Sequence, residues 1–267
     1  MDHDQQYFQI RIDKSRRADL ERKPNKWIAA LAPAPKTGRV LDIACGMGYD
    51  ALAWARTGRK VVAVDYSQGL LRQASRLARE QGVDNVFFVA CDATRLPFRD
   101  GTFDVSYSEN LFEHVPQWQE VGLEARRVLA TGGLFFVRTT NRYCPRNPEI
   151  RNLHFYPLLP DVMKRPILRW VVRRRPEWVG HTAFPAVNWF THRGLSRFFT
   201  RLGFQTYETF DLIRRDMLSP SKRKFYAVLE LLKRYRALRY FVYPLLPTVQ
   251  ILAVKAGTVE GDPRASL

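Results

Sequence analysis

Cysteine is scarce in this chain, which argues against both a disulfide framework and a cysteine-based metal centre. Only Cys45, Cys91 and Cys144 occur among 267 residues, an odd number without metal-ligand spacing. His, Asp and Glu form no cluster with such spacing either. We therefore expect no metal, and we expect the reducing cytoplasm to be the natural compartment.

Long hydrophobic runs are missing too. The longest uncharged run, residues 240–254, is about 15 residues long and is broken by Pro244 and Pro247, which is too short to span a bilayer. The N-terminus reads Met-Asp-His-Asp-Gln-Gln and has no apolar core of a secretion signal behind it. The sequence predicts a cytoplasmic protein that does not cross a membrane, and it leaves peripheral contact with a membrane surface open.

Acidic residues are few in the second half of the chain. Residues 145–267 hold 22 Lys and Arg against 9 Asp and Glu, whereas residues 1–144 hold 21 against 17. A basic field of this kind attracts phosphates, anionic lipid surfaces or nucleic acid. We expect the substrate, or the surface that carries it, to be anionic.

The most informative feature that is present lies in two short segments. Residues 40–48 read Val-Leu-Asp-Ile-Ala-Cys-Gly-Met-Gly, and residues 61–66 read Val-Val-Ala-Val-Asp-Tyr. The pattern predicts a buried strand, a glycine turn, a helix, and a second strand that ends in Asp65, whose carboxylate can accept both hydroxyls of a ribose. The glycines also satisfy Gly-x-Gly-x-x-Ala, which alone would allow a nicotinamide dinucleotide.

Asp42 favours another cofactor, because a carboxylate at the end of the first strand can face a cationic group. Here the chain resembles the class I S-adenosylmethionine-dependent methyltransferases, whose first motif reads Asp-x-Gly-x-Gly-x-Gly. Ala44 replaces the first glycine, a change that we expect binding to tolerate. The family's later motifs follow in the same order, at residues 85–98, 102–115 and 125–137.

The resemblance covers about residues 38–142 and implies an α/β fold: a doubly wound, seven-stranded, mostly parallel sheet with helical substrate-side insertions. It also implies S-adenosyl-L-methionine as the cofactor, with S-adenosyl-L-homocysteine as the product. The residues implied at the cofactor are Asp42 at its amino group; Ala44, Cys45, Gly46 and Gly48 around its amino-acid part; Asp65 at the ribose, with Tyr66 next to it in the sequence; Asp92 and Ala93 at the adenine; and Ser108, Glu109 and Asn110 where the fourth strand opens.

The chain divides into a core with elaborations. Predicted strands alternate with helical patterns, which is typical of a parallel sheet covered on both faces. The strands are expected at 40–43, 61–64, 86–89, 105–107, 134–137, 205–209 and 249–256. The expected segments are a helical cofactor-closing segment (1–37), the cofactor-binding core (38–142), a basic aromatic insertion (143–190), a core helix with the sixth strand (191–209), a basic amphipathic insertion (210–247), the seventh strand (248–257) and a polar tail (258–267).

Both insertions contain an amphipathic basic pattern, at residues 165–175 and 222–242. One interpretation is contact with an anionic membrane or a lipid-linked substrate. The other is a lid helix that packs its apolar stripe on the core and exposes its arginines. In the second segment the expected stripe is Phe225, Val228, Leu229, Leu232, Tyr235, Leu238 and Val242, and the expected surface cations are Lys233, Arg234, Arg236 and Arg239.

Proton removal from a hydroxyl acceptor needs a base, and histidine titrates in the useful range. The candidate catalytic residues are His154 and His181, both in the first insertion. His114 is common at its position in similar enzymes, so we expect it to be structural or cofactor-adjacent. His192 precedes a helix and is expected at the surface.

The sequence predicts methyl transfer to a small-molecule or lipid-linked acceptor, at oxygen rather than at nitrogen or carbon. An RNA methyltransferase is one alternative, because Trp170, Trp178 and Trp189 are interleaved with the basic residues. The lack of an Asn-Pro-Pro-Tyr-like tetrapeptide after the fourth strand disfavours nucleic acid. A non-catalytic fold that keeps the cofactor pocket is the other alternative, and no oligomeric state is predicted.

Overall fold

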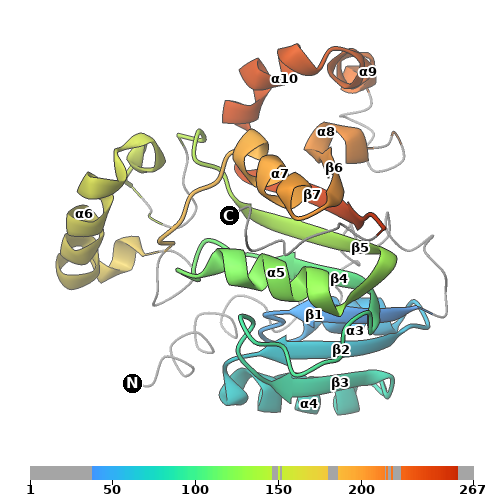
Figure 1. The fold of residues 1–267 in the computed structure, drawn as a ribbon. Coiled ribbons are helices and arrows are strands. Elements are labelled where there is room, and N and C mark those ends of the chain that lie inside the picture. The colour runs from blue at the N-terminus through green and yellow to red at the C-terminus, as the bar shows by residue number, and fades with distance from the viewer. Residues whose placement is uncertain are drawn as a thin grey trace.

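The computed structural model describes residues 38–145, 150, 152–179, 186–213, 215, 218 and 224–257. The predicted cofactor-closing segment (1–37) and the predicted polar tail (258–267) lie outside these residues. The described chain builds one twisted sheet with helices on both faces (Figure 1). Among the described helices, none is long and apolar enough to span a membrane.

Seven strands of the described chain form this sheet, in the order β3-β2-β1-β4-β5-β7-β6. Their bounds are β1 Arg39–Ile43, β2 Lys60–Asp65, β3 Val86–Ala90, β4 Phe103–Glu109, β5 Leu129–Thr140, β6 Phe204–Glu208 and β7 Thr248–Lys255. β7 is antiparallel to β5 and β6, and the other neighbours pair in parallel. The predicted fold class is therefore confirmed, and each predicted strand overlaps an observed one.

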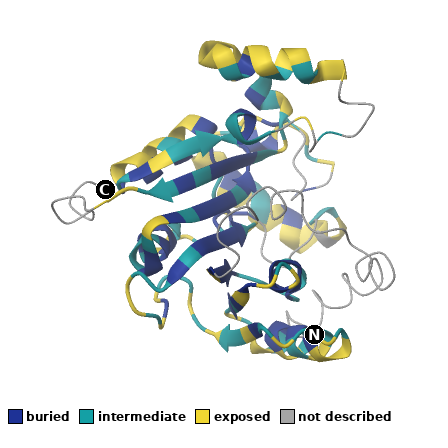
Figure 2. Ribbon diagram, turned by 90° about the vertical axis from the view of Figure 1, so that its right-hand side faces the viewer, coloured by how far each residue is buried: buried dark blue, intermediate teal, exposed yellow. Residues whose placement is uncertain are grey.

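The central strands are apolar on both faces because helices cover both. α3 (Tyr49–Ala55) and α4 (Gln68–Glu80) pack on one face, and α5 (Trp118–Val128) and α7 (His192–Arg201) pack on the other. The strands are consequently the most deeply buried part of the molecule (Figure 2).

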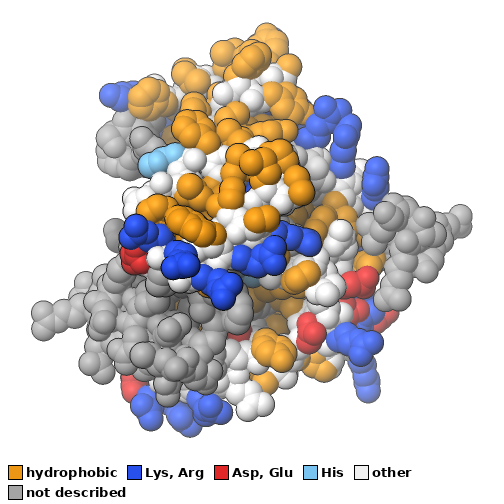
Figure 3. All heavy atoms as spheres, turned by 90° about the vertical axis from the view of Figure 1, so that its left-hand side faces the viewer, with side chains coloured by type: hydrophobic (Ala, Val, Ile, Leu, Met, Phe, Trp, Pro, Cys, Tyr) orange, Lys and Arg blue, Asp and Glu red, His pale blue; other side chains and the backbone are white. Residues whose placement is uncertain are grey.

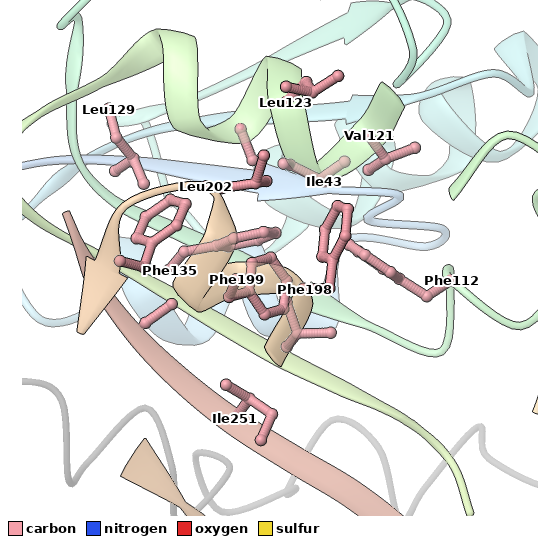
Figure 4. Close-up of a cluster of buried hydrophobic side chains, with 14 of the residues drawn as sticks. Ile43, Phe112, Val121, Leu123, Leu129, Phe135, Phe198, Phe199, Leu202 and Ile251 are labelled. Carbon is pink, nitrogen blue, oxygen red and sulfur yellow. The ribbon is translucent and has the colours of Figure 1, made fainter. Parts of the chain in front are cut away.

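The larger hydrophobic cluster lies between the sheet and the helices α5 and α7 (Figure 4). Phe112, Phe135 and Phe199 meet in it, with ring centroids 5.5 to 6.2 Å apart.

Ser67 and Thr191 cap the N-termini of α4 and α7. The side-chain oxygen of each accepts a backbone N–H of its helix, at 3.1 and 2.9 Å.

Both insertions leave from the edge of the sheet at which the parallel strands end (Figure 1). Between β5 and α7 lie η1 (Tyr156–Leu158), α6 (Asp161–Arg174) and η2 (Pro176–Trp178). Between β6 and β7 lie α8 (Thr209–Leu212), α9 (Tyr226–Arg234), α10 (Arg236–Val242) and η5 (Tyr243–Leu245). Whatever binds at this edge has both insertions beside it.

The prediction of one amphipathic helix over residues 222–242 is wrong. The chain breaks at Tyr235 (φ −115°, ψ 86°) into α9 and α10. Because of this break, Arg239, predicted at the surface, turns inward to 1% exposure and reaches the carboxylate of Asp211 at 2.6 Å. Conversely, Val228 and Leu238, predicted in the inward stripe, are exposed at 52% and 38%.

Candidate functional site

The loop after β1 adopts a backbone that favours glycine at three positions. Ala44, Gly46 and Gly48 have φ values of 63°, 53° and 77°, in the left-handed region. The loop is closed by hydrogen bonds from the Cys45 N–H to the Val64 carbonyl (2.9 Å) and from the Gly48 N–H to the Cys45 carbonyl (2.8 Å). The loop thus turns tightly at the end of β1 and brings its backbone to the edge of the sheet.

Asp65, at the end of β2, is held in place by backbone donors on both oxygens. Its Oδ2 accepts the Gly46 N–H at 2.8 Å, and its Oδ1 accepts the Ser67 N–H at 2.9 Å. A carboxylate has about four acceptor sites, so these bonds orient the group without exhausting it. The sequence pairs Asp65 with the glycine loop, and the structure brings the two together.

Asp42, on β1 just before the loop, is a buried carboxylate. It is 3% exposed, and among the described residues its Oδ2 has no hydrogen-bond partner. Burial raises its pKa well above the usual value, and the nearby charges of Asp50, Glu109 and Asp65 add to the rise. Such a site gains stability from a cation, because a positive charge favours the ionised carboxylate.

A cavity of about 370 Å³ opens beside Asp65. It gathers five residues predicted at the cofactor: Ala44, Asp65, Tyr66, Asp92 and Ala93. His114, expected to be structural or cofactor-adjacent, lines the same cavity. The rest of the lining was not predicted from the sequence and consists of Val64, Cys91, Thr94, Leu111, Val115, Pro116 and Gln117. Most of these residues follow β3 or β4 and belong to the motifs at residues 85–98 and 102–115. Their position in these motifs could have indicated that they lie near the cofactor.

Within this cavity, Asp92 forms a turn, because its Oδ1 accepts the backbone N–H and the hydroxyl of Thr94, both at 2.8 Å. Apolar side chains from both strand ends, among them Val64, Leu111 and Val115, line the same space. A cavity with acidic groups at its rim and apolar walls fits a flat, polar-edged ring such as a nucleobase.

The end of β4 forms a separate polar group. The Tyr107 hydroxyl donates to Glu109 at 2.6 Å, and Arg138 on β5 forms an ion pair with the other Glu109 oxygen at 2.9 Å. Burial, followed by the charges of Asp50 and Glu109, raises the pKa of Tyr107 and keeps its hydroxyl protonated. Ser108 is buried and Asn110 has φ 56°; like Glu109, neither lines the cavity described above.

The remaining predicted residues have other surroundings. Cys45, Gly46 and Gly48 belong to the loop but not to the cavity lining. His154 is exposed, in the turn before η1, and does not line the cavity either. His181 lies outside the described residues. Within the part of the chain that the structure describes, no group of His, Cys, Asp and Glu could hold a metal ion.

His192, expected at the surface, is buried at 2% exposure. Its ring stacks on Tyr243 at a centroid distance of 3.7 Å, and its Nε2 lies 3.2 Å from the Thr209 hydroxyl. Burial lowers its pKa to about 3. The ring is therefore neutral and joins α7 to the second insertion, and it does not line the cavity.

Comparison with known proteins identifies the segment that carries this site. Residues 41–137 match the model of a family described as "Methyltransferase domain". The chain is 34% identical over 112 residues to the uncharacterized methyltransferase YcgJ of Bacillus subtilis (42% of this chain, 44% of the relative). It is 34% identical over 110 residues to the ubiquinone/menaquinone biosynthesis C-methyltransferase UbiE of Desulfotalea psychrophila (40% and 44%).

These alignments cover less than half of either relative. The fold likeness extends further: the crystal structure of YcgJ from Bacillus subtilis superimposes with a TM-score of 0.56 at 20% identity, over 87% of this chain and 97% of that one. The likeness in fold therefore includes parts of the insertions that the sequence alignments leave out.

Proposed function

This chain carries a class I S-adenosylmethionine-dependent methyltransferase domain, and from this premise we propose that it transfers a methyl group to a small-molecule or lipid-linked acceptor. The observation that carries the proposal is the placement of two carboxylates around one glycine loop. Asp42 lies one residue before the end of β1, and Asp65 ends the neighbouring parallel strand β2. The glycine loop that follows β1 has its backbone at the same edge of the sheet.

The residues present fit S-adenosylmethionine. The buried Asp42 oxygen without a partner suits a ligand ammonium, directly or through water, and the oriented Asp65 carboxylate suits the ribose hydroxyls. Gly48 packs so closely that an added Cβ would lie 3.0 Å from Ala74 and Phe88. Asp92 and Ala93 would meet the edge of the adenine, and the apolar walls of the cavity would meet its faces.

When bound, this cofactor supplies an electrophilic methyl group on a sulfonium centre. The task of the chain is to align the acceptor with that methyl group and to exclude water, and orientation of this kind can supply much of the acceleration. The carboxyl end of β4 lies between the glycine loop and the insertions and carries Ser108, Glu109 and Asn110. We assign them to the boundary between cofactor and acceptor, with Glu109 oriented by Tyr107 and Arg138.

The acceptor atom is proposed to be oxygen, with a base drawn from His154 or His181 in the first insertion. Carbon is a second candidate, because UbiE, a relative by sequence, is named as a C-methyltransferase of ubiquinone and menaquinone biosynthesis. That name also supports a lipid-linked acceptor. The free thiols of Cys45, Cys91 and Cys144 are consistent with the cytoplasmic location that we propose.

Calorimetric titration with S-adenosylmethionine and S-adenosylhomocysteine tests the cofactor site. Asp65→Ala should weaken binding at least about 100-fold, since the carboxylate would no longer accept charge-assisted hydrogen bonds from the two ribose hydroxyls. Asp84→Ala, an exposed acid before β3, is the matched control and should bind as the unchanged protein does. Equal affinity in Asp65→Ala, or preference for NAD, would overturn the assignment.

The ionisation of Asp42 gives a readout that needs no acceptor. A cationic ligand lowers the raised pKa of Asp42, so binding at mildly acidic pH should release a proton. The measured binding enthalpy should then change with the ionisation enthalpy of the buffer, and Asp42→Asn should reduce that dependence.

Turnover is tested separately, with labelled methyl and acceptors that offer oxygen or carbon. Labelled product would establish the enzyme and its atom. Cofactor binding without any transfer would favour a non-catalytic fold.

A further inference from the structure

Helix α6 presents three different faces. Lys164 and Val171 are buried toward the body, at 2% and 0% exposure. Met163 and Trp170, seven residues apart, point outward on one line with 48% and 52% exposure. A surface helix that packs one stripe and exposes a second apolar stripe has a face available for another surface.

The third face of α6 is basic. Arg165, Arg169 and Arg173 are all exposed and follow each other at four-residue spacing, so they form a row along the helix beside the outward apolar stripe. Long arginine side chains can lie along an apolar surface while their guanidinium groups reach a polar layer.

Helix α10 and its continuation expose a second apolar group. Phe241 and Leu245 are 81% and 74% exposed, and Tyr240 is 53% exposed. They stand on a helix that is fixed from behind, because Arg239 holds it to Asp211. The exposed side chains are therefore presented from a fixed element.

Hydrophobic side chains at the heights of both helices are visible on one side of the molecule (Figure 3). Figure 3 looks from the side on which α6 lies in Figure 1, toward which the parallel strands run. Hydrophobic side chains gather at the top of this view, at the height of α10, and in its middle, at the height of α6. A row of Lys and Arg runs below the middle group.

We propose that α6 and α10 form one docking face for an anionic phospholipid bilayer. The arginine row would contact lipid phosphates, and Met163, Trp170, Phe241 and Leu245 would enter the boundary between headgroups and acyl chains. A second copy of the chain is disfavoured as the occupant, because its own arginine row would oppose this one. Nucleic acid would satisfy the arginines but would leave Phe241 and Leu245 exposed to water.

This inference goes beyond methyl transfer and does not depend on it. It adds that the edge of the sheet bearing the candidate site faces the lipid, so an acceptor held in a bilayer would meet the cofactor side directly.

Flotation of the full chain with lipid vesicles tests the proposal. Binding is expected to vesicles of phosphatidylcholine with phosphatidylglycerol, to weaken with salt, and to be much weaker to phosphatidylcholine alone. Replacing Arg165, Arg169 and Arg173 by serine should weaken binding roughly a hundredfold, since each basic residue near the surface contributes about fivefold. Replacing Phe241 and Leu245 by serine should weaken it by at least about tenfold.

The matched control replaces Arg72, Arg76 and Arg79 of α4 by serine, three exposed arginines on another part of the molecule. It changes the net charge equally and should leave vesicle binding within about twofold. Equal losses in the two triple variants, no binding to anionic vesicles, or tighter binding to RNA than to vesicles would each overturn the proposal. Unchanged S-adenosylhomocysteine affinity in the variants shows that they fold, and it separates failure of this proposal from failure of the cofactor site.

Discussion

The cofactor-side core and the helical insertions bury their side chains very differently. Among the described residues of 38–142, Tyr66 and Phe87 are the large hydrophobic side chains that lie exposed, whereas α6, α9 and α10 each expose several. The core is held by a sheet and two extensive clusters, and each insertion rests on a small cluster. The structure of the core is therefore stabilised mainly by hydrophobic packing, whereas the structure of the insertions depends on a few polar contacts.

The most concentrated of these contacts surrounds Arg239. Its guanidinium donates twice to Asp211, at 3.0 and 2.6 Å, and to the carbonyl of Leu232 at 2.7 Å. Nearby, the Tyr243 hydroxyl donates to Glu208. Burial opposes ionisation of Asp211, but the Arg239 hydrogen bonds outweigh it and hold the pKa of Asp211 below its usual value.

Arg239→Met should produce the largest loss. It leaves the Asp211 carboxylate without its partner, which costs about 3–5 kcal/mol for a buried pair. Hydrogen exchange should show α9 and α10 losing protection while β1 and β2 keep theirs. Arg236→Met is the matched control, because Arg236 is exposed and 3.8 Å from the same carboxylate, and it should cost less than about 1 kcal/mol. Uniform loss of protection across the sheet would contradict the division into two regions.

Low pH should lower the free energy of unfolding through His192, which lies where the core meets the second insertion. Its pKa is lowered to about 3 in the folded state, against about 6.5 in the unfolded chain. The unfolded state therefore binds more protons between these values, so stability is complete above pH 6.5 and declines by up to about 1.4 kcal/mol per pH unit toward pH 3. Urea titrations across this range should show a shallower decline for His192→Phe, which keeps a ring against Tyr243. His154→Phe, at an exposed histidine, should leave the slope unchanged.

The same contrast explains what could be predicted from the sequence. Strands such as β1 and β2 were predictable because buried parallel strands are short, continuous apolar runs. Asp65 was predictable because a motif fixes its distance along the chain from the glycine loop. Apolar runs and motif spacing are both local along the chain, and such local patterns specify most of the core.

Inward-facing polar residues in the second insertion and at its junction with the core were not predictable in this way. Arg239 is buried against Asp211, 28 residues earlier, and the spacing of residues along a helix gives no information on that partner. His192 is buried because Tyr243 covers it from a distant segment. For the cavity, the contribution of residues 115–117 depends on how the loop after β4 folds back, and the sequence of this loop does not indicate that.

Within the core, Gly48→Ala should be moderately destabilising. The new Cβ would lie 3.0 Å from both Ala74 and Phe88, and the residue would keep φ near 77°. Left-handed strain and overpacking together should cost about 2 kcal/mol. Thermal unfolding measures the loss, and Gly82→Ala, with φ 63° and open space at its Cβ, separates the strain from the clash. If both variants lose the same stability, packing on α4 does not restrict the loop.

The smallest effect is expected at Ala44, where the chain departs from the family's glycine. Its φ of 63° costs an L-residue about 1–2 kcal/mol, and Ala44→Gly removes this strain while adding freedom to the unfolded chain that offsets about 0.4–1 kcal/mol. The net gain in unfolding free energy should be about 0.5 kcal/mol. Cofactor affinity should change less than about twofold, because the loop already has the required shape. A large gain in affinity would instead mean that the alanine methyl group, which lines the cavity, restricts the bound cofactor.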